Sequence, residues 1–398
     1  MMKHRAYTSV FRAHFSALAL SFVALTPWAQ QPTLTWLGVP SGYRGSFFTD
    51  ISADGRTVVG HLWVGGSCGD DLRPIVWTRD RGFTILRSDG YAGGFARAIS
   101  ADGLTIVGNR NSNCSPYYGA VWTFNGLAEP SDAAGEACYD VSANGSAVVG
   151  ATLYFGGVRA FRWTPTGGIV NLGTLVGGDG SFAFGVSADG SIVVGWAKDS
   201  SGKFRAFRWT QQTGMQSLGA SVLIGNISYS YDNSEALGIS PDGNVIVGIA
   251  YNDRNEAVGF RNIRRGAQRV NISLGDPPKG YTGIVPRRTN QDGSIIVGSM
   301  RKSDGSPRAM RWTEAGGLED LNVTYASLLE PGEILEWAHD ITPDGRYIVG
   351  WGVKDGTQQG FILDTGVCNL PADVNGDGIV NDQDLLQVLF EFGNRCGQ

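Results

Sequence analysis

The chain has 398 residues, of which 42% are hydrophobic and 17% are charged, and its formal net charge at pH 7 is −5. The apolar content allows a packed core and argues against a disordered chain, and the negative charge argues against a nucleic-acid partner. The 58 glycines are about twice the usual share, which favours a β protein with many turns.

The N-terminal segment has the features of a secretory signal peptide. Basic residues precede an apolar run at positions 15–25, and small residues follow as far as Ala29. The run is shorter than the roughly 20 apolar residues of a membrane-spanning helix. We therefore expect residues 1–30 to be removed, leaving a secreted or cell-surface protein without a membrane span.

A ten-residue motif recurs seven times along the chain. It reads ISADGRTVVG at 51–60, and related copies lie at 99–108, 141–150, 186–195, 239–248, 289–298 and 341–350. A hydroxyl or amide residue opens each copy's turn, Asp or Asn comes two residues later, and glycine follows. This order is typical of a type I turn followed by a left-handed glycine, and the β-branched run after it is typical of a strand. The motif therefore predicts a tight hairpin, with its acidic residues acting as turn formers.

A second pattern follows each motif. AFRWT at 160–164 and 206–210 predicts a third strand, and GGIVNLG at 167–173 predicts a glycine turn with a short fourth strand. Four antiparallel strands in each unit of 42 to 53 residues are typical of a β-propeller blade. Seven units predict an all-β, seven-bladed β-propeller over residues 31–366.

The two ends of this region predict how the ring closes. LTWLG at 34–38 has the fourth-strand pattern but no blade precedes it, and the seventh unit ends at GFILDT, 360–365, without a fourth strand. One strand from each end would complete a single blade. A linear β-solenoid is the alternative, but it gives no reason for this complementary missing strand.

The repeat resembles a known family. DGSIVVGWA (189–197) and FRAFRWT (204–210) are similar to the HAF repeats of extracellular proteins, and the resemblance covers about residues 33–365. Where that family has a histidine in strand three, the two closest copies here have Arg159 and Arg205. SPDG also resembles the WD-like propeller repeats of periplasmic proteins. Both resemblances imply a propeller, and neither implies an activity.

The C-terminal segment, 367–398, contains a candidate calcium loop, DVNGDGIVNDQD at 373–384. Such loops take oxygen ligands from positions 1, 3, 5, 7 and 12 around a glycine at position 6. The residues at the ligand positions are Asp373, Asn375, Asp377, Ile379 (through its carbonyl) and Asp384. We expect a structural Ca²⁺ here and no other cofactor. The alternative is an ordinary turn rich in Asp and Gly.

This loop and the apolar helix expected after it look like one half of a type I dockerin, a module that usually has two halves. The resemblance implies attachment or partner binding outside the cell, through a cohesin-like or cell-surface protein. The apolar face of the helix could pack on its own loop or on that partner.

The cysteines all follow the signal segment, so disulfides are permitted. Cys368 and Cys396 bracket the C-terminal segment and are expected to pair. Of the other three, a Cys114–Cys138 bridge is preferred, which would leave Cys68 unpaired.

Candidate chemistry is sparse. His61 and His339 remain after signal removal, and we interpret them as surface or packing residues in unrelated blades. Asp50, Asp140 and Asp340 precede the motif on the expected innermost strands, where paired acids could hydrolyse glycosides. The favoured alternative is that these acids bind backbone amides at blade edges, so no catalytic residue is assigned.

Loops rich in tyrosine and glycine, such as SGYRGSFF at 41–48 and GNISYSYDN at 225–233, suit sugar or protein recognition. The sequence therefore predicts an exported, non-enzymatic binding propeller, with polysaccharide or protein as the ligand of its face. The alternative is a carbohydrate-active enzyme attached through the dockerin-like tail.

Overall fold

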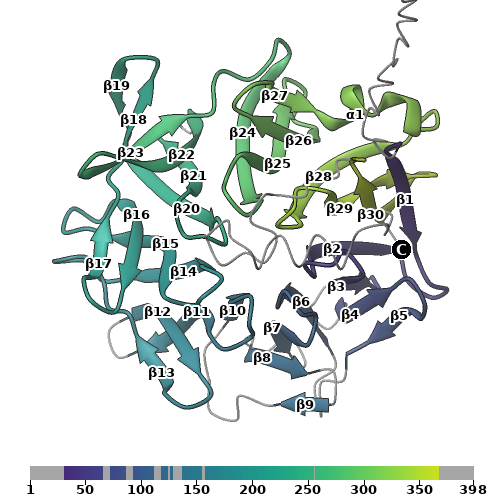
Figure 1. Ribbon diagram of the computed structural model, residues 1–398, viewed down its shortest axis with the longest axis horizontal. Coiled ribbons are helices and arrows are strands. Elements are labelled where there is room, and N and C mark those ends of the chain that lie inside the picture. The colour runs from purple at the N-terminus through teal and green to yellow at the C-terminus, as the bar shows by residue number, and fades with distance from the viewer. Residues whose placement is uncertain are drawn as a thin grey trace, which may run out of the picture.

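The computed structural model describes residues 31–65, 72–86, 93–111, 118–123, 126–128, 137–154, 157–254 and 256–366. In this part of the chain the strands form seven sheets, six of four strands and one of six, arranged as a ring around a central axis (Figure 1). The predicted seven-bladed β-propeller is confirmed. The predicted signal peptide, 1–30, and calcium module, 367–398, lie outside the described residues.

Each blade contains four antiparallel strands, which we number outward from the axis, and the sheet of blade 5 has two further strands at its outer edge. The blades are numbered 1 to 7 in chain order. The first strands are β2 (Gly45–Ile51), β6 (Gly93–Ile99), β10 (Ala137–Val141), β14 (Ser181–Val186), β20 (Asn233–Ile239), β24 (Tyr281–Thr289) and β28 (Ile334–Ile341). The second strands are β3 (Thr57–Trp63), β7 (Thr105–Asn111), β11 (Val148–Tyr154), β15 (Ile192–Lys198), β21 (Ile246–Tyr251), β25 (Ile295–Lys302) and β29 (Tyr347–Lys354).

The third strands contain the predicted AFRWT-type strings. They are β4 (Leu72–Thr78), β8 (Tyr118–Thr123), β12 (Gly157–Thr164), β16 (Phe204–Thr210), β22 (Ala257–Arg265), β26 (Pro307–Thr313) and β30 (Thr357–Asp364). The fourth strands are β5 (Gly82–Ile85), β9 (Gly126–Ala128), β13 (Gly168–Asn171), β17 (Gly214–Ser217), β23 (Gln268–Ser273), β27 (Gly317–Asp320) and, in blade 7, β1 (Thr33–Gly38).

The ring closes as predicted from the two chain ends. β1 pairs antiparallel with β30, so that Leu34 lies opposite Leu363 and Trp36 lies opposite Phe361. The Trp36 and Phe361 rings meet edge to face at 6.0 Å. The N-terminal strand therefore supplies the fourth strand that the seventh repeat lacks.

The repeated motif forms the turn between the first and second strands, as the sequence predicts. In blade 1, Gly55 has φ +72° and donates its N–H to the Ser52 carbonyl at 2.9 Å. The Ser52 hydroxyl donates to Asp54 at 2.6 Å and accepts the Thr57 N–H at 3.0 Å. Asp54 also accepts the Arg56 N–H at 3.0 Å. The acidic residue of the motif is thus a turn former.

The second residue of each turn links neighbouring blades through its backbone. Ala53 donates to the carbonyl of Ala101 at 3.0 Å, and Ala101 donates to that of Ala143 at 2.9 Å. The series continues through blades 4 and 5. Pro241 has no N–H to donate, and the Asp242 N–H instead donates to Gln291 at 3.4 Å. This explains why the position tolerates many side chains: its contribution comes from the main chain.

The apolar core lies between neighbouring blades. One cluster joins blades 7 and 1 and includes Phe48, Val58 and Val349, all fully buried. The phenylalanine of the third-strand string is also fully buried, as at Phe161 and Phe207. Burying each such ring stabilises the fold by about 1.5–3 kcal/mol.

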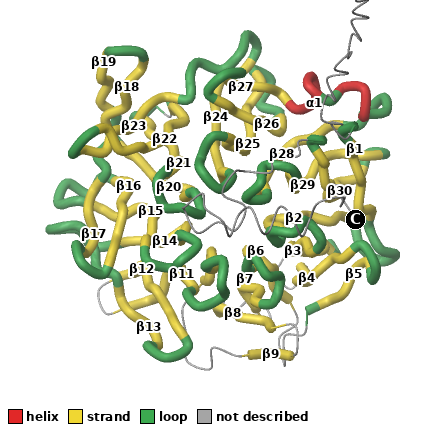
Figure 2. Tube along the Cα trace, in the orientation of Figure 1, coloured by secondary structure: helices red, strands yellow, loops and turns green. Residues whose placement is uncertain are grey.

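Two features depart from the sequence expectations. The segment 225–233, expected to be a loop, contributes to a hairpin of β18 (Ser221–Ile224) and β19 (Ile227–Ser230) that projects from blade 5 (Figure 1). Gly225 has φ +60° in its two-residue turn, which suits a hairpin. A short helical segment, α1 (Leu321–Thr324) and η2 (Ala326–Leu328), precedes blade 7 (Figure 2).

The preferred Cys114–Cys138 bridge is wrong. Cys138 carries a free thiol that is buried with Val121 and Phe161 between blades 2 and 3. Its alternating position on β10 directs it into this core, and burial raises the pKa of the thiol to about 12. Cys114, Cys68 and the predicted pair Cys368 and Cys396 lie outside the described residues.

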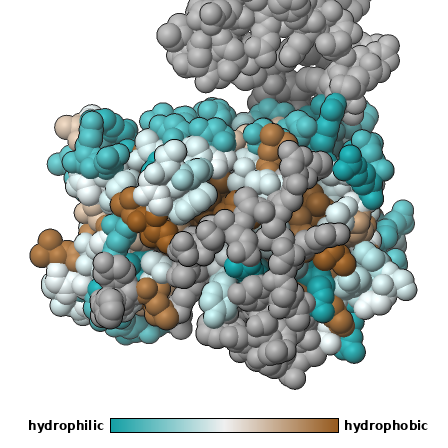
Figure 3. All heavy atoms as spheres, turned by 90° about the horizontal axis from the view of Figure 1, so that it is seen from below, coloured by the Kyte–Doolittle hydropathy of each residue, from teal (hydrophilic) through white to brown (hydrophobic). Residues whose placement is uncertain are grey.

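Exposed apolar side chains on the described surface are scattered among polar ones. In the edge-on view of Figure 3 they form separate patches. The most exposed are Val176, Val323 and Leu153. No helix in the described part of the chain has the length and apolarity needed to cross a membrane.

Candidate functional site: the central cavity

Each first strand contains a β-bulge at the same repeat position. In β2 the register to β3 breaks between Phe48 and Asp50, so Thr49 has no partner in the ladder. The bulged residue always lies two positions before the first residue of the motif. The seven bulged residues are Thr49, Arg97, Tyr139, Phe184, Leu237, Arg287 and His339. A bulge re-aims a side chain, and here each blade directs one toward the axis.

A glycine in the second strand of each blade allows the backbone of the first strand to come close to that of the second. A Cβ on Gly60 would lie 1.9 Å from the Phe47 carbonyl oxygen, and one on Gly195 would lie 1.9 Å from that of Phe182. Real Cβ atoms never approach an oxygen that closely. The glycine that ends each TVVG or IVVG string therefore lets the first strand pack against the second near its bulge.

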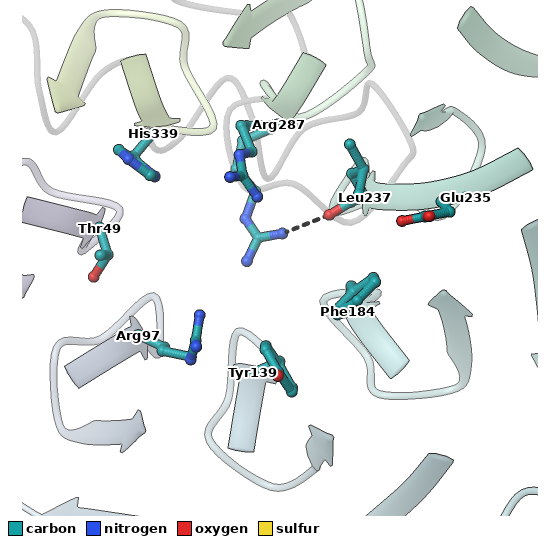
Figure 4. Close-up of a pocket in the computed structure, with 9 residues that line it drawn as sticks. Thr49, Arg97, Tyr139, Phe184, Glu235, Leu237, Arg287 and His339 are labelled. Carbon is teal, nitrogen blue, oxygen red and sulfur yellow. Dashed lines mark hydrogen bonds between the residues drawn. The ribbon is translucent and has the colours of Figure 1, made fainter. Parts of the chain in front are cut away.

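All seven bulged residues line one cavity on the axis (Figure 4). Its volume is about 320 Å³, and Glu235 and Arg288 complete the lining. An adjoining lobe of about 410 Å³ has an aromatic wall that includes Phe47, Phe95, Trp337 and Trp351. We refer to the two together as the central cavity. Its size is within the range of small-molecule sites, about 300–1,000 Å³.

The central cavity contains guanidinium groups from two non-adjacent blades. Arg97 lies 4.5 Å from the Phe95 ring and 4.4 Å from the Tyr139 ring. Arg287 lies 5.4 Å from the Trp337 ring. Burial, with the charges of Arg288 and Arg97, lowers the pKa of Arg287 to about 10. Arg287 therefore remains charged at neutral pH.

Arg288 separates the central cavity from a second cavity on the side of the motif turns. It lines both. Its Nη2 lies 3.1 Å from Oδ1 of Asp140, and its Nη1 donates to the Leu237 carbonyl at 3.3 Å. The turn-side cavity, of about 200 Å³, is lined by Asp50, Asp340 and the second residues of the turns, among others.

The three acids predicted on the first strands are buried and bind backbone amides of the next blade. Asp50 accepts the Ile99 N–H at 2.8 Å, and Asp140 accepts the Val186 N–H at 2.9 Å. Asp340 accepts the Ile51 N–H at 3.2 Å. These bonds agree with the favoured interpretation, in which the acids bind backbone amides at blade edges.

Two of these acids also interact with each other. Asp50 and Asp340 both accept the Ile51 N–H. Burial, and next the charge of Asp340, raise the pKa of Asp50 well above its ordinary value. Burial also raises the pKa of Asp140, although the Arg288 charge opposes this. The structure thus brings Asp50 and Asp340 together and places Asp140 against an arginine.

The interpretation of His61 and His339 as residues of unrelated blades is wrong. Ring closure makes blades 1 and 7 neighbours, and both imidazoles line the central cavity. His61 stacks on Phe47 at 5.1 Å, and His339 Nε2 accepts the Trp351 indole N–H at 3.0 Å. Burial lowers the pKa of His61 to about 4 and that of His339 well below its ordinary value. Both rings are therefore neutral at pH 7.

No group of three or more His, Cys, Asp or Glu side chains in the described residues is arranged to hold a metal ion. The predicted calcium ligands, Asp373, Asn375, Asp377, Ile379 and Asp384, lie outside that part of the chain.

Comparisons with known proteins bear on the fold alone. No family model matches the chain, and no curated protein matches it. Among solved structures, a putative TolB from Agrobacterium tumefaciens is 13% identical, with TM-score 0.44, covering 84% of this chain and 98% of the other. An oligogalacturonate lyase in complex with manganese is 13% identical, with TM-score 0.50, covering 83% and 92%.

A third similar structure is the β-propeller domain of the Trilobed protease from Pyrococcus furiosus, 11% identical with TM-score 0.47, covering 81% of this chain and 97% of the other. Of these structures, the oligogalacturonate lyase supports the propeller fold of this chain. At these identities the likeness concerns the fold alone.

Proposed function

We propose that this chain is an exported, non-enzymatic binding propeller whose central cavity receives a ligand. The observation that carries the proposal is the convergence of seven bulged side chains, of six residue types, on that cavity. The turns and the contacts between blades repeat nearly unchanged around these residues. The residue type therefore varies between repeats mainly at the positions that would contact a ligand. Such a site supplies arginine, aromatic, hydroxyl and imidazole groups from separate, rigidly held strands.

The carboxylates support binding over glycoside hydrolysis in this cavity. Hydrolysis uses two carboxyl groups flanking the bond that breaks. Among the described residues lining the central cavity, Glu235 is the single carboxylate, and it accepts the Tyr251 hydroxyl at 2.8 Å. The acids Asp50 and Asp340 line the turn-side cavity instead.

The C-terminal segment belongs to the proposal as an attachment module. Its dockerin-like loop would bind Ca²⁺ through Asp373, Asn375, Asp377, Asp384 and the Ile379 carbonyl, and the ion would stabilise the module rather than catalyse a reaction. A cohesin-like or cell-surface protein is the partner that this chemistry suggests. The HAF-like repeat pattern and the signal-like segment 1–30 support an extracellular location.

A second candidate is a carbohydrate-active enzyme that uses the Asp50–Asp340 pair. The raised pKa of Asp50 favours it, because a carboxyl that keeps its proton to a higher pH is suited to act as a general acid. The turn-side cavity in which they lie is the smaller one, about 200 Å³.

A polysaccharide pull-down beside a polysaccharide release assay tests the proposal on residues 31–398. We expect retention on a polysaccharide without release of sugar. Retention should fall when Tyr139 is changed to Ala and should persist when Asp340 is changed to Asn. Sugar release that Asp340→Asn or Asp140→Asn abolishes would instead establish the enzyme.

A further inference from the structure

The central cavity contains a cation that the described residues do not neutralise. Arg288 is paired with Asp140, but the adjacent Arg287 has no carboxylate within ion-pair distance among the described residues. Its Nε is buried and has no hydrogen-bond partner there. A buried polar group without a partner is costly. An anion bound in the cavity would supply both the missing charge and the missing acceptor.

The neutral His339 ring adds a second donor near this cation. Its Nε2 accepts the Trp351 indole N–H, so the ring proton is carried by Nδ1. Figure 4 shows the His339 ring and the Arg287 side chain on the same side of the cavity. Arg97 extends into the cavity from blade 2. The polar groups on this side of the cavity are therefore mainly donors, which suits an acceptor such as a carboxylate.

The wall beside these donors is aromatic and continuous. Trp337 and Trp351 stack at 6.3 Å, and Trp351 meets Phe47 edge to face at 5.2 Å. Such a wall favours a ligand with an apolar face, such as the C–H face of a sugar ring. Inorganic phosphate or sulfate would satisfy the arginine but would leave this wall uncovered.

On the opposite side, the cavity offers an acceptor. Glu235 lies across it from His339 (Figure 4). Burial raises the pKa of Glu235, although the Tyr251 hydroxyl donates to it. A ligand that reaches from Arg287 to Glu235 therefore carries a negative group at one end and a hydroxyl donor at the other.

We propose that the central cavity binds a uronic-acid residue of a polysaccharide, with the Arg287 guanidinium holding its carboxylate and Trp337 and Trp351 packing on its ring. This deepens the proposed binding function and rests on it. A planar carboxylate matches a guanidinium through two parallel hydrogen bonds. Glu235 accepts a hydroxyl of the same sugar.

The test compares two sugars that differ only at C6. Methyl β-D-glucuronide carries a carboxylate where methyl β-D-glucoside carries CH₂OH. Binding to residues 31–398 is measured by calorimetry and by the tryptophan fluorescence of the wall. We expect the glucuronide to bind at least about tenfold more tightly than the glucoside. Equal affinities, or no glucuronide binding at about 10 mM, would overturn the proposal.

Variants of Arg287 connect this preference to the cavity. Arg287→Met should weaken glucuronide binding by about tenfold or more and leave glucoside binding unchanged. Arg287→Lys keeps the charge without the paired geometry and should lose less. Arg301→Met, at an exposed position of β25, is the matched control and should bind as the parent does. Full glucuronide affinity in a folded Arg287→Met variant would refute the assignment.

Two competitors test whether the bound anion belongs to another class of ligand. N-acetylglycyl-phenylalanine presents a peptide carboxylate beside an aromatic ring, and sodium sulfate presents a charge alone. Tighter binding of the peptide, or equal displacement of glucuronide by sulfate, would replace the uronic acid with that ligand and end the proposal. Retention of a neutral polysaccharide in the pull-down would meanwhile keep the broader binding function, so the two failures are distinguishable.

Discussion

Arg288 and Asp140 meet near the axis of the ring, although they come from blades 6 and 3 and lie 148 residues apart in the chain; Nη2 is 3.1 Å from Oδ1. Both side chains are mostly buried, and Asp140 also accepts the Val186 N–H of blade 4. One carboxylate thus connects three blades. The contact separates the central cavity from the turn-side cavity.

Asp140→Ala should destabilise the propeller. It leaves a buried arginine without its counter-ion and the Val186 N–H without its acceptor, which together cost about 2–4 kcal/mol. The midpoint of urea unfolding measures this. Asp276→Asn, an exposed carboxylate, should stay within about 0.5 kcal/mol of the parent. If both variants unfold at the parent's midpoint, the ion pair contributes nothing.

Asp340→Asn should have the opposite effect. An asparagine still accepts the Ile51 N–H, and it removes the charge that helps to raise the pKa of Asp50. A carboxyl with a raised folded-state pKa makes the protein less stable as the pH rises from the unfolded-state pKa to the folded-state pKa, so the cost is present at neutral pH and fades as the pH falls toward the unfolded-state pKa. We expect a gain of about 1–2 kcal/mol at pH 7.5 and a smaller gain at pH 4.5. A loss at pH 7.5 would contradict this account.

His61→Phe tests the lowered pKa of His61. The folded state keeps this ring neutral down to about pH 4, whereas the unfolded chain takes up a proton near pH 6.5. Stability from the neutral ring is therefore present above pH 6.5 and is lost as the pH falls toward 4, by up to about 3 kcal/mol. Phenylalanine does not titrate, and it removes a buried Nδ1 that has no hydrogen-bond partner among the described residues.

The free energy of unfolding of His61→Phe, less that of the parent, should therefore be larger at pH 5 than at pH 7. Chemical unfolding at the two pH values measures it. If the difference in free energy of unfolding between the variant and the parent does not change with pH, His61 has the same pKa in the folded and unfolded states.

The fold was predictable because it repeats local chemistry. In each motif the hydroxyl or amide residue, the Asp or Asn and the glycine specify a turn without reference to distant residues, and seven copies specify seven blades. The unmatched strand at 34–38 specified the closure. The hairpin at 221–230 was missed, although its alternating residues flank a Gly-Asn turn.

The site was much less predictable. Strict alternation along β6 gives no reason for Arg97 to face the axis, because the bulge adds one residue and re-aims a single side chain. The aligned repeats do contain a signal for the site. The position two residues before the motif carries different residue types in different repeats, for example Thr49 in the first and His339 in the seventh. The proximity of His61 and His339 follows from ring closure and not from their spacing in the sequence.

The predicted calcium loop can be tested independently of the propeller. Changing both Asp373 and Asp377 to Ala removes two of its carboxylates and should weaken calcium binding, because the hard cation depends on charged oxygen ligands. Calorimetry with calcium measures the affinity, and proteolysis of residues 367–398 reports the ordering of the module. The urea midpoint of the propeller should not change. Unaltered calcium affinity would reject the site.

Ser46 of blade 1 hydrogen-bonds to both strands that close the ring in blade 7, β1 and β30. Its hydroxyl donates to the Gly38 carbonyl of β1 at 2.7 Å and accepts the Gly360 N–H of β30 at 3.0 Å. Ser46→Ala leaves that buried N–H without an acceptor, which should cost about 1–3 kcal/mol. Because β1 closes the ring, protease cleavage near residues 33–38 should also increase. Ser228→Ala on the exposed strand β19 is the control and should change neither quantity; equal cleavage in both variants would show that Ser46 does not secure the closure.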